Sequence, residues 1–353
     1  MSSPLLLTIG TASSQNLSIF DPVSPPAESI HHLSILVLAT TGGIFLVVES
    51  VLIYSLLRFR RAYVPGSSEP PQVYGSKPIE IAWTAAPALI VFVLTLVIAR
   101  TEWEVRVDPE RIPPDLKESK PLRVTVVGHQ WWWEYIYDRY GDEKLDFVTA
   151  NELHVPASNR QVPSERRPIF LTLQAADVNH SFWVPRLAGK TDLVPGKTNT
   201  MWFETERTGL FVGQCAEFCG TQHANMLLRV YVDPPEDFER WMANEREKAR
   251  ESGNAEVRKG KDVFFAQSCI NCHRVRGTLV RGTLARGTFG PDLTHLMSRE
   301  TLAGGMIPND REGKNLRDWI ADPQKIKSGC LMPAFGLSES DLDRIVRYLA
   351  SLE

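Results

Sequence analysis

Two long apolar stretches near the N-terminus constrain the fold of this chain most. Residues 33–57 form an almost wholly apolar run of 25 residues, and residues 79–99 form a second run of 21. A helix that crosses the hydrocarbon core of a bilayer needs about 20 apolar residues, whereas a soluble core helix is rarely so long and so apolar all round. The sequence therefore predicts a transmembrane helical hairpin over residues 31–100, preceded by an external segment, residues 1–30.

The loop between the two runs, residues 58–78, predicts the orientation of the hairpin. It holds three arginines and one lysine against a single acid, Glu69. Cytoplasmic loops are enriched in Lys and Arg, so we expect a multi-pass protein of a bacterial inner membrane with both termini on the outer, periplasmic side. Glu80 lies at the cytoplasmic end of the second run. Such a carboxylate either reaches the interface or has a function, because charges inside a membrane are costly.

The region after the hairpin, residues 101–233, changes to short β-type runs. Runs rich in Val, Ile, Leu and Thr, separated by Pro and Gly, occur at residues 122–127, 169–173, 200–203 and 226–232. Regularly spaced short strands with turn signals are typical of an all-β sandwich or barrel.

A cluster of soft metal ligands lies beside the last of these runs. Cys215, Cys219, His223 and Met226 fall within 12 residues, and His180 follows an earlier predicted strand. Two cysteines and one or two histidines can hold zinc. The wider spacing of the cysteines and the nearby methionine favour copper in an electron-transfer site. Two thiolates at this spacing can bridge two copper ions, with one histidine on each.

A second cluster, Cys269-Ile-Asn-Cys272-His273, has the spacing of covalent haem c attachment. The two cysteines are expected to form thioethers and His273 to be the proximal iron ligand. Amphipathic helices at both ends of residues 254–353 predict an all-α domain, and such helices around a C-x-x-C-H motif resemble a class I cytochrome c. A charged helical linker, residues 234–253, connects it to the preceding domain.

The distal ligand of this haem is predicted to be Met332. It lies about 60 residues after the C-x-x-C-H motif and before the last predicted helix, where similar cytochromes carry their methionine. Other candidates are His295, Met297 and Met306. A distal methionine raises the potential relative to a haem with two histidines.

Several motifs of the chain resemble cytochrome c oxidase subunit II. They are Asp177-Val-Asn-His-Ser-Phe182, Gly189-Lys-Thr-Asp192, Pro195-Gly196, Gly213-Gln-Cys215 onward, Gly128-His-Gln-Trp-Trp-Trp133 and Glu80-Ile-Ala-Trp-Thr84. The resemblance extends from the first apolar run to about Trp241. It implies a cupredoxin fold with a dinuclear copper centre, CuA.

The resemblance also implies a role for each ligand. Cys215 and Cys219 would bridge the two coppers, and His180 and His223 would be the terminal ligands. The weak outer ligands would be Met226 and the backbone carbonyl of Glu217.

Three further roles follow from the same resemblance. The Glu217 side chain would bind magnesium at a site shared with subunit I. Trp131 would be the surface aromatic where electrons enter from cytochrome c, and Glu80 the glutamate at the mouth of a proton channel. Trp132 departs from the family, which usually has tyrosine at this position.

The charge is distributed unevenly over the two extramembrane regions. Residues 101–253 carry 19 Lys and Arg against 25 Asp and Glu, a balance of −6, and residues 254–353 carry 15 against 12, a balance of +3. Opposite signs favour docking of one domain on the other, although imbalances of this size also occur on ordinary solvated surfaces. The Arg-Gly-Thr repeat that begins at Arg276 predicts a flexible basic loop. Cys330 is expected to be an inert buried thiol.

Together these features predict subunit II of a caa3-like terminal oxidase with a fused cytochrome c. Electrons from an external donor, a cytochrome c or a quinol-oxidising complex, would pass through haem c and CuA to subunit I, where oxygen is reduced with proton pumping. We also expect subunit III and the lipid bilayer as partners, and no nucleic acid. One alternative is the CuA subunit of a nitric oxide reductase, which Glu80 and Glu217 weigh against. The other is a membrane-tethered copper-binding or copper-delivery protein, for which a covalent haem has no use.

Overall fold

The computed structural model describes residues 18–60, 66, 72, 74–106, 116, 118–280 and 283–353. Most of the predicted external segment, residues 1–30, and much of the predicted cytoplasmic loop lie outside the described residues. The chain divides into two compact units, Glu28–Arg106 and a larger unit made of Met1–Ala27 with Val107–Glu353.

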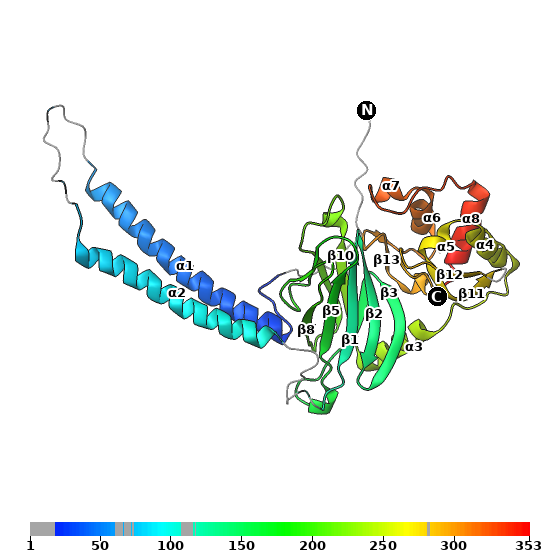
Figure 1. The fold of residues 1–353 in the computed structure, drawn as a ribbon, viewed down its shortest axis with the longest axis horizontal. Coiled ribbons are helices and arrows are strands. Elements are labelled where there is room, and N and C mark those ends of the chain that lie inside the picture. The colour runs from blue at the N-terminus through cyan, green and yellow to red at the C-terminus, as the bar shows by residue number, and fades with distance from the viewer. Residues whose placement is uncertain are drawn as a thin grey trace. The chain divides into compact units, whose positions relative to one another are not determined.

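The first unit consists of two long helices that run side by side as a hairpin, α1 (Pro25–Arg58) and α2 (Lys77–Val105) (Figure 1). Their most apolar windows have mean hydropathies of 2.2 and 2.4, and 0% of either window is buried within the chain. A core helix of a soluble domain would be mostly buried, so these exposed apolar surfaces fit a lipid environment. The predicted helical hairpin is confirmed.

The second unit begins with a sandwich of two five-stranded sheets, with strand orders β3-β2-β1-β5-β8 and β4-β10-β9-β6-β7. The four predicted strands are confirmed as β1 (Leu122–His129), β5 (Ile169–Ala175), β8 (Asn199–Phe203) and β10 (Leu227–Asp233). The other six strands lie outside the predicted runs: β2 (Trp132–Tyr140), β3 (Glu143–Ala150), β4 (Glu152–Pro156), β6 (His180–Trp183), β7 (Thr191–Leu193) and β9 (Gly209–Cys215).

Alternating side chains explain why these segments form a sandwich. In β1, Leu122, Val124 and Val126 are buried while the residues between them are partly exposed. Side chains of a strand point to opposite faces in turn, so this pattern places one face of the sheet on the core. β2 adds Trp133 and Tyr135, both fully buried, to the same core.

Strand pairing brings together ligands that are far apart in the sequence. β6 begins at His180, β9 ends at Cys215, and the two strands pair in antiparallel register with Phe182 opposite Cys215. The first histidine of the predicted copper cluster therefore lies beside its first cysteine at one end of the sandwich. The rigid sheet fixes the site, as the sandwich prediction requires.

Helix α3 (Pro235–Arg246) confirms the helical character of the predicted linker. It also packs on the sandwich, because Phe238 and Met242 are buried in its core. Trp241 stacks on His154 with 4.5 Å between the ring centroids. The first half of the linker is therefore anchored to the β-domain.

The C-terminal domain is mainly helical. It contains α4 (Ala255–Ala266), α5 (Cys269–Cys272), α6 (Lys314–Ala321), α7 (Pro323–Ile326) and α8 (Glu339–Leu349), with the short strands β11 (Arg274–Val280), β12 (Thr283–Arg286), β13 (Thr301–Leu302) and β14 (Ile307–Pro308). The Ser338 hydroxyl accepts a hydrogen bond from the Asp341 amide at 3.1 Å and so caps α8. The predicted basic loop is instead the β11–β12 hairpin, because its backbone pairs in antiparallel register.

Candidate copper and haem sites

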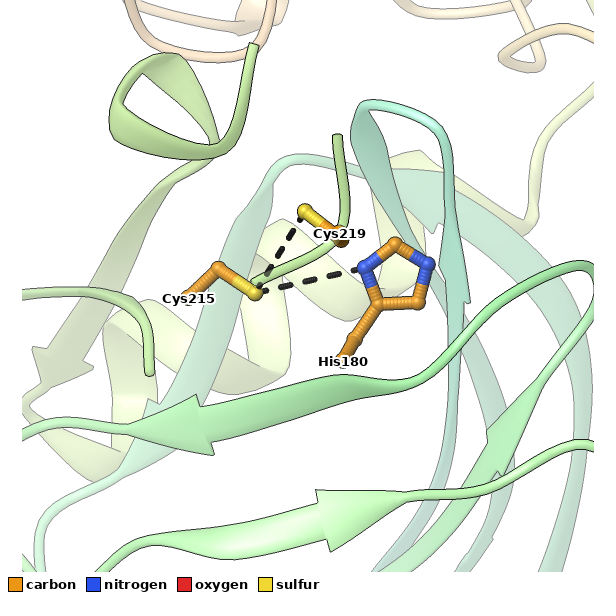
Figure 2. Close-up of side chains that lie close together, drawn as sticks. All are labelled: His180, Cys215 and Cys219. Carbon is orange, nitrogen blue, oxygen red and sulfur yellow. Dashed lines mark hydrogen bonds between the residues drawn. The ribbon is translucent and has the colours of Figure 1, made fainter. Parts of the chain in front are cut away.

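The two cysteines of the first cluster lie side by side in the buried end of the sandwich. The Cys215 and Cys219 sulfurs are 3.8 Å apart, and Cys215 Sγ lies 4.0 Å from His180 Nδ1 (Figure 2). All three side chains are buried, and they point toward one another. The sulfurs are too far apart for a disulfide, which needs about 2.05 Å, so both thiols are free to bind metal.

The remaining predicted ligands surround the same pair. Cys219 Sγ lies 3.6 Å from His223 Nδ1 and 3.9 Å from the Met226 sulfur, and Cys215 Sγ lies 3.2 Å from the Glu217 carbonyl oxygen. His223 is held by the short 3₁₀ turn η3 (His223–Asn225), which directly precedes β10. Each thiol therefore has a histidine nitrogen and one weak donor beside it. This set of soft ligands fits a copper electron-transfer centre.

Asp177 orients the His180 ring, a contact that the sequence analysis did not identify. Its Oδ1 lies 2.8 Å from His180 Nε2, which leaves Nδ1 facing Cys215. The carboxylate also accepts hydrogen bonds from the Val178 amide at 2.7 Å and the Gln130 amide at 2.6 Å. A carboxylate that holds the other nitrogen of a ligand histidine fixes the ring and raises its basicity.

The two thiols differ in acidity, because each forms a hydrogen bond with the other. The hydrogen bond between the two sulfurs lowers the pKa of the Cys215 thiol and raises the pKa of the Cys219 thiol. Burial alone lowers the pKa of His180, but its hydrogen bonds to Asp177 and Cys215 raise it overall. Cys215 is therefore the more acidic of the two thiols, and metal binding would displace the protons that the pair still carries.

Gly128 gives the histidine ring the space that it occupies. A Cβ atom at this position would lie 2.9 Å from His180 Cδ2. Any larger residue would displace the ring, so the glycine in the Gly128-His129-Gln130 motif makes room for a residue of the candidate metal site. Only the folded structure shows this contact, because the two residues lie on different strands.

Trp131 contacts the copper cluster directly. Its Nε1 donates a hydrogen bond to the Cys219 carbonyl at 2.9 Å, and the Gln130 side-chain amide donates to the same oxygen at 2.7 Å. The expected surface aromatic is nevertheless buried, with 8% of its area exposed. The expectation of an exposed residue is corrected here, because the C-terminal domain packs on this side of the sandwich.

A mainly apolar cavity in the C-terminal domain adjoins the second cluster. Its lining includes Cys269, Cys272, His273 and Met332. Trp131 and Trp132 of the β-domain also line it. The predicted haem ligands and the predicted electron-accepting tryptophan therefore share one cavity.

His273 is oriented for a ligand in this cavity. Its Nδ1 lies 2.8 Å from the Pro291 carbonyl, which leaves Nε2 free to bind. A Cβ at Gly290 would lie 2.7 Å from His273 Cε1, and one at Gly287 would lie 2.3 Å from the Cys272 carbonyl carbon. The two glycines let the backbone pass closely over the motif, so the residues present fit a haem held at this position.

The cavity also separates the candidates for the distal ligand. His295 binds the Glu353 and Glu247 carbonyls through its two ring nitrogens, at 2.8 and 3.1 Å. Among the residues that line the cavity are Met332 and Cys330, but neither Met297 nor Met306. Met332 is thus the candidate whose position suits the role. Cys330 is partly exposed rather than buried.

The structure places the two predicted glutamates in different surroundings. Glu80 lies in the first turn of α2, where its Oε1 accepts a hydrogen bond from the Ser76 amide at 3.2 Å. Glu217 is half-buried between the two cysteines, beside the exposed Phe218.

These features define a class of protein: a membrane-anchored electron carrier with a copper-type cupredoxin domain and a cytochrome-type domain in one chain. Three family models match the chain. "Cytochrome C oxidase subunit II, transmembrane domain" covers residues 12–98, "Cytochrome C oxidase subunit II, periplasmic domain" covers residues 122–232, and "Cytochrome c" covers residues 257–353.

Named relatives agree over nearly the whole chain. Cytochrome c oxidase subunit 2 of Alkalihalophilus pseudofirmus is 34% identical over 99% of this chain and 94% of its own length. The subunit 2 of Bacillus sp. (strain PS3) is 31% identical over 84% of this chain and 80% of its own length. The chain therefore belongs to the cytochrome c oxidase subunit 2 family.

Membership of this family fixes the general role. The chain is an electron-transfer subunit of a haem-copper terminal oxidase, and its domains imply CuA copper and haem. It is anchored in a membrane through α1 and α2, carries a periplasmic domain, and associates with subunit I.

Proposed function

We propose that this subunit passes electrons from an external donor, through a covalently bound haem c and CuA, to subunit I, where oxygen is reduced with proton pumping. The complex would lie in a bacterial inner membrane with subunit III as a further partner. The observation that carries this proposal is the position of Trp131. It hydrogen-bonds the carbonyl of Cys219 and lines the cavity that adjoins the C-x-x-C-H motif.

In the copper domain, Cys215 and Cys219 would bridge two copper ions with His180 and His223 as terminal ligands. The Met226 sulfur and the Glu217 carbonyl would bind more weakly. The centre supplies one-electron transfer. The chain contributes rigidity, because His180 and Cys215 are buried on paired strands and Asp177 holds His180. A fixed ligand geometry keeps the cost of reorganisation on reduction low.

In the cytochrome domain, Cys269 and Cys272 would form thioethers to haem c. His273 would bind the iron, with its ring oriented by the Pro291 carbonyl. Met332 would be the distal ligand, and a methionine there keeps the potential higher than a second histidine would. The mainly apolar lining would limit the access of water to the haem, which has the same effect on the potential.

Two glutamates would serve the partner subunit. The Glu217 side chain would bind magnesium at the contact with subunit I, close to the copper ligands on either side of it. Glu80 would lie where protons enter subunit I, since it is the first acid of α2. Both roles rest on the family resemblance of the motifs that contain these residues.

The variant Cys219→Ser tests the electron route. It removes a bridging thiolate and leaves the haem domain unchanged, so reduction of haem c by the donor should proceed at the wild-type rate. Reoxidation of that haem by the assembled oxidase should stop, because the acceptor is lost. Stopped-flow spectra of the haem bands measure both steps, and normal reoxidation in the variant would refute the route.

Metal content tests the cofactor assignment independently of turnover. Elemental analysis of the purified full-length chain should give about two coppers per iron, as the ligand set of the two sites implies. One copper per iron, or zinc in place of copper, would show that the dinuclear assignment is wrong.

A further inference from the structure

A buried lysine of the cytochrome domain reaches into the copper domain. Lys327 directly follows α7, has 2% of its area exposed, and donates hydrogen bonds from Nζ to three backbone carbonyls. These are the carbonyls of Trp131 at 2.8 Å, Ala303 at 2.9 Å and Asn225 at 3.0 Å. Trp131 and Asn225 belong to the copper domain, and Asn225 directly precedes the Met226 ligand.

The charge state of Lys327 matches this arrangement. Burial lowers the pKa of Lys327 to about 8, so the side chain is still mainly an ammonium at neutral pH. An ammonium has three N–H donors, one for each of the three carbonyls. A lysine is almost never fully buried unless its charge is compensated in this way.

A buried acid of the copper domain makes the reciprocal contact. Glu152 has 2% of its area exposed, and its carboxylate accepts hydrogen bonds from the Glu300 amide at 3.0 Å and the Thr301 amide at 2.8 Å. The Thr301 hydroxyl also donates to it, at 2.5 Å. Each domain therefore places a charged group among polar backbone groups of the other.

We propose that Lys327, with Glu152 as its counterpart, is the positioning residue that docks the cytochrome domain on the copper domain and so makes Trp131 a wall of the haem cavity. This inference rests on the proposed electron route, to which it adds a named contact. With both cofactors bound, the step would be the transfer of one electron from reduced haem to oxidised copper, with no proton or further reactant required. Lys327 would act on this step only by holding the two domains together.

The location of the three carbonyls supports a role beyond general stability. Lys327 binds the backbone of Trp131, whose side chain hydrogen-bonds Cys219, and the backbone beside the Met226 ligand. The neighbouring Gln222 side chain, in the copper loop, donates to the Ser328 carbonyl at 2.6 Å. Two consecutive residues of the cytochrome domain therefore fix the copper loop and the tryptophan together.

Hydrogen exchange measures this docking without reference to activity. In Lys327→Met the side chain has similar length but cannot donate, so the carbonyls of Trp131 and Asn225 remain buried without it. Truncating such a buried partner should lower the docking equilibrium by about thirtyfold. The amide of Thr301, which is bonded to Glu152 across the interface, should then exchange about thirtyfold faster.

The matched control is Lys325→Met, two residues away and exposed. Full-length chain loaded with copper and haem is used for all variants. Exchange at Thr301 should be unchanged in the control and faster in Lys327→Met. Equal exchange in Lys327→Met and wild type would overturn the proposal.

A spectroscopic readout separates docking from damage to either centre. In the docked wild type, ferric haem should speed the electron-spin relaxation of the copper signal through space, an effect that falls steeply with distance. Lys327→Met should lose this enhancement while both centres keep their spectra and potentials. A variant with normal relaxation and slow electron transfer would refute a positioning role.

A second variant covers the case in which Lys327→Met does not retain its cofactors. Glu152→Gln keeps one acceptor oxygen but turns a donor toward the Glu300 amide, so it should reduce the relaxation enhancement in the same way. Wild-type relaxation in Glu152→Gln would then overturn the proposal. If wild-type haem is not reoxidised through copper at all, the electron route fails, while exchange and relaxation still decide the role of Lys327.

Discussion

The substitution Asp177→Asn would remove one charge beside the copper ligands while keeping the shape of the side chain. In the wild type, Oδ1 accepts from the Val178 amide and lies 2.8 Å from His180 Nε2, and Oδ2 accepts from the Gln130 amide at 2.6 Å. An asparagine has only one acceptor oxygen. If that oxygen keeps the bonds to Val178 and His180, the new NH₂ group faces the Gln130 N–H, and two donors meet.

The size of the effect follows from these contacts. A buried donor that loses its acceptor costs about 1–3 kcal/mol, but the Gln130–Asp177 contact is exposed, so water can replace the lost acceptor at a smaller cost. The main effect is that loss of the carboxylate makes the imidazole less basic. Changes to the partner of a ligand histidine typically lower metal affinity about 10- to 100-fold. We therefore expect copper affinity to fall about 10- to 100-fold. The position of Trp131 should also change, because Trp131 directly follows Gln130.

Competition of the copper-loaded full-length chain with a chelator measures the affinity. The control Asp192→Asn changes an exposed acid on β7 of the same domain and should bind copper like the wild type. Hydrogen bonding lowers the pKa of Asp177 against the effect of its burial, so the difference between Asp177→Asn and wild type should persist in mildly acidic buffer. Wild-type affinity in Asp177→Asn would refute the assignment of Asp177 as the residue that orients His180.

Two further substitutions test the packing and protonation of the chain. In Gly260→Ala the new Cβ would lie 2.1 Å from the Arg344 carbonyl oxygen, where α4 meets α8. Overpacking of this kind costs about 1–3 kcal/mol or more, so the melting temperature of the haem domain should fall. The control Gly253→Ala, whose new Cβ has nothing within 4 Å, should not lower it. Glu245 is buried, and burial raises the pKa of its carboxyl above the usual 4.5. Its contribution to stability is therefore present below pH 4.5 and is lost as the pH rises through the higher folded-state value. Glu245→Gln, which never ionises, should become more stable than the wild type over that range; melting curves at several pH values measure this, and a constant difference would contradict it.

The sequence could predict the elements that carry strong local signals. The two apolar runs, the β-branched runs of β1, β5, β8 and β10, and the amphipathic last helix all appear where expected. β2 was not identified, because Glu134, Asp138 and Arg139 interrupt its apolar pattern. The fold resolves this, since Trp133, Tyr135 and Tyr137 alternate with those residues and are fully buried.

The candidate metal ligands were predictable for a related reason. Cys215, Cys219, His223 and Met226 lie within one loop, so their spacing alone carries the chemistry. The groups that orient them do not share this advantage. Gly128 contacts His180 across two strands that are far apart in the sequence. The sequence alone does not indicate such a contact, because glycine occurs at many positions for other reasons.

The interface between the two soluble domains was the least predictable feature. Their opposite net charges favour docking in general, but the contacts that hold them are local and buried. Lysine is among the residues least often buried, so the sequence predicts that Lys327 lies at the surface. The structure instead buries it among three carbonyl partners. The same holds for Trp131, which a comparison of motifs places at the surface.

A fused cytochrome domain covers the face that would otherwise receive a diffusing partner, and tethering keeps that domain at high effective concentration there. The expected consequence is that an external donor delivers its electron to the haem domain rather than to Trp131.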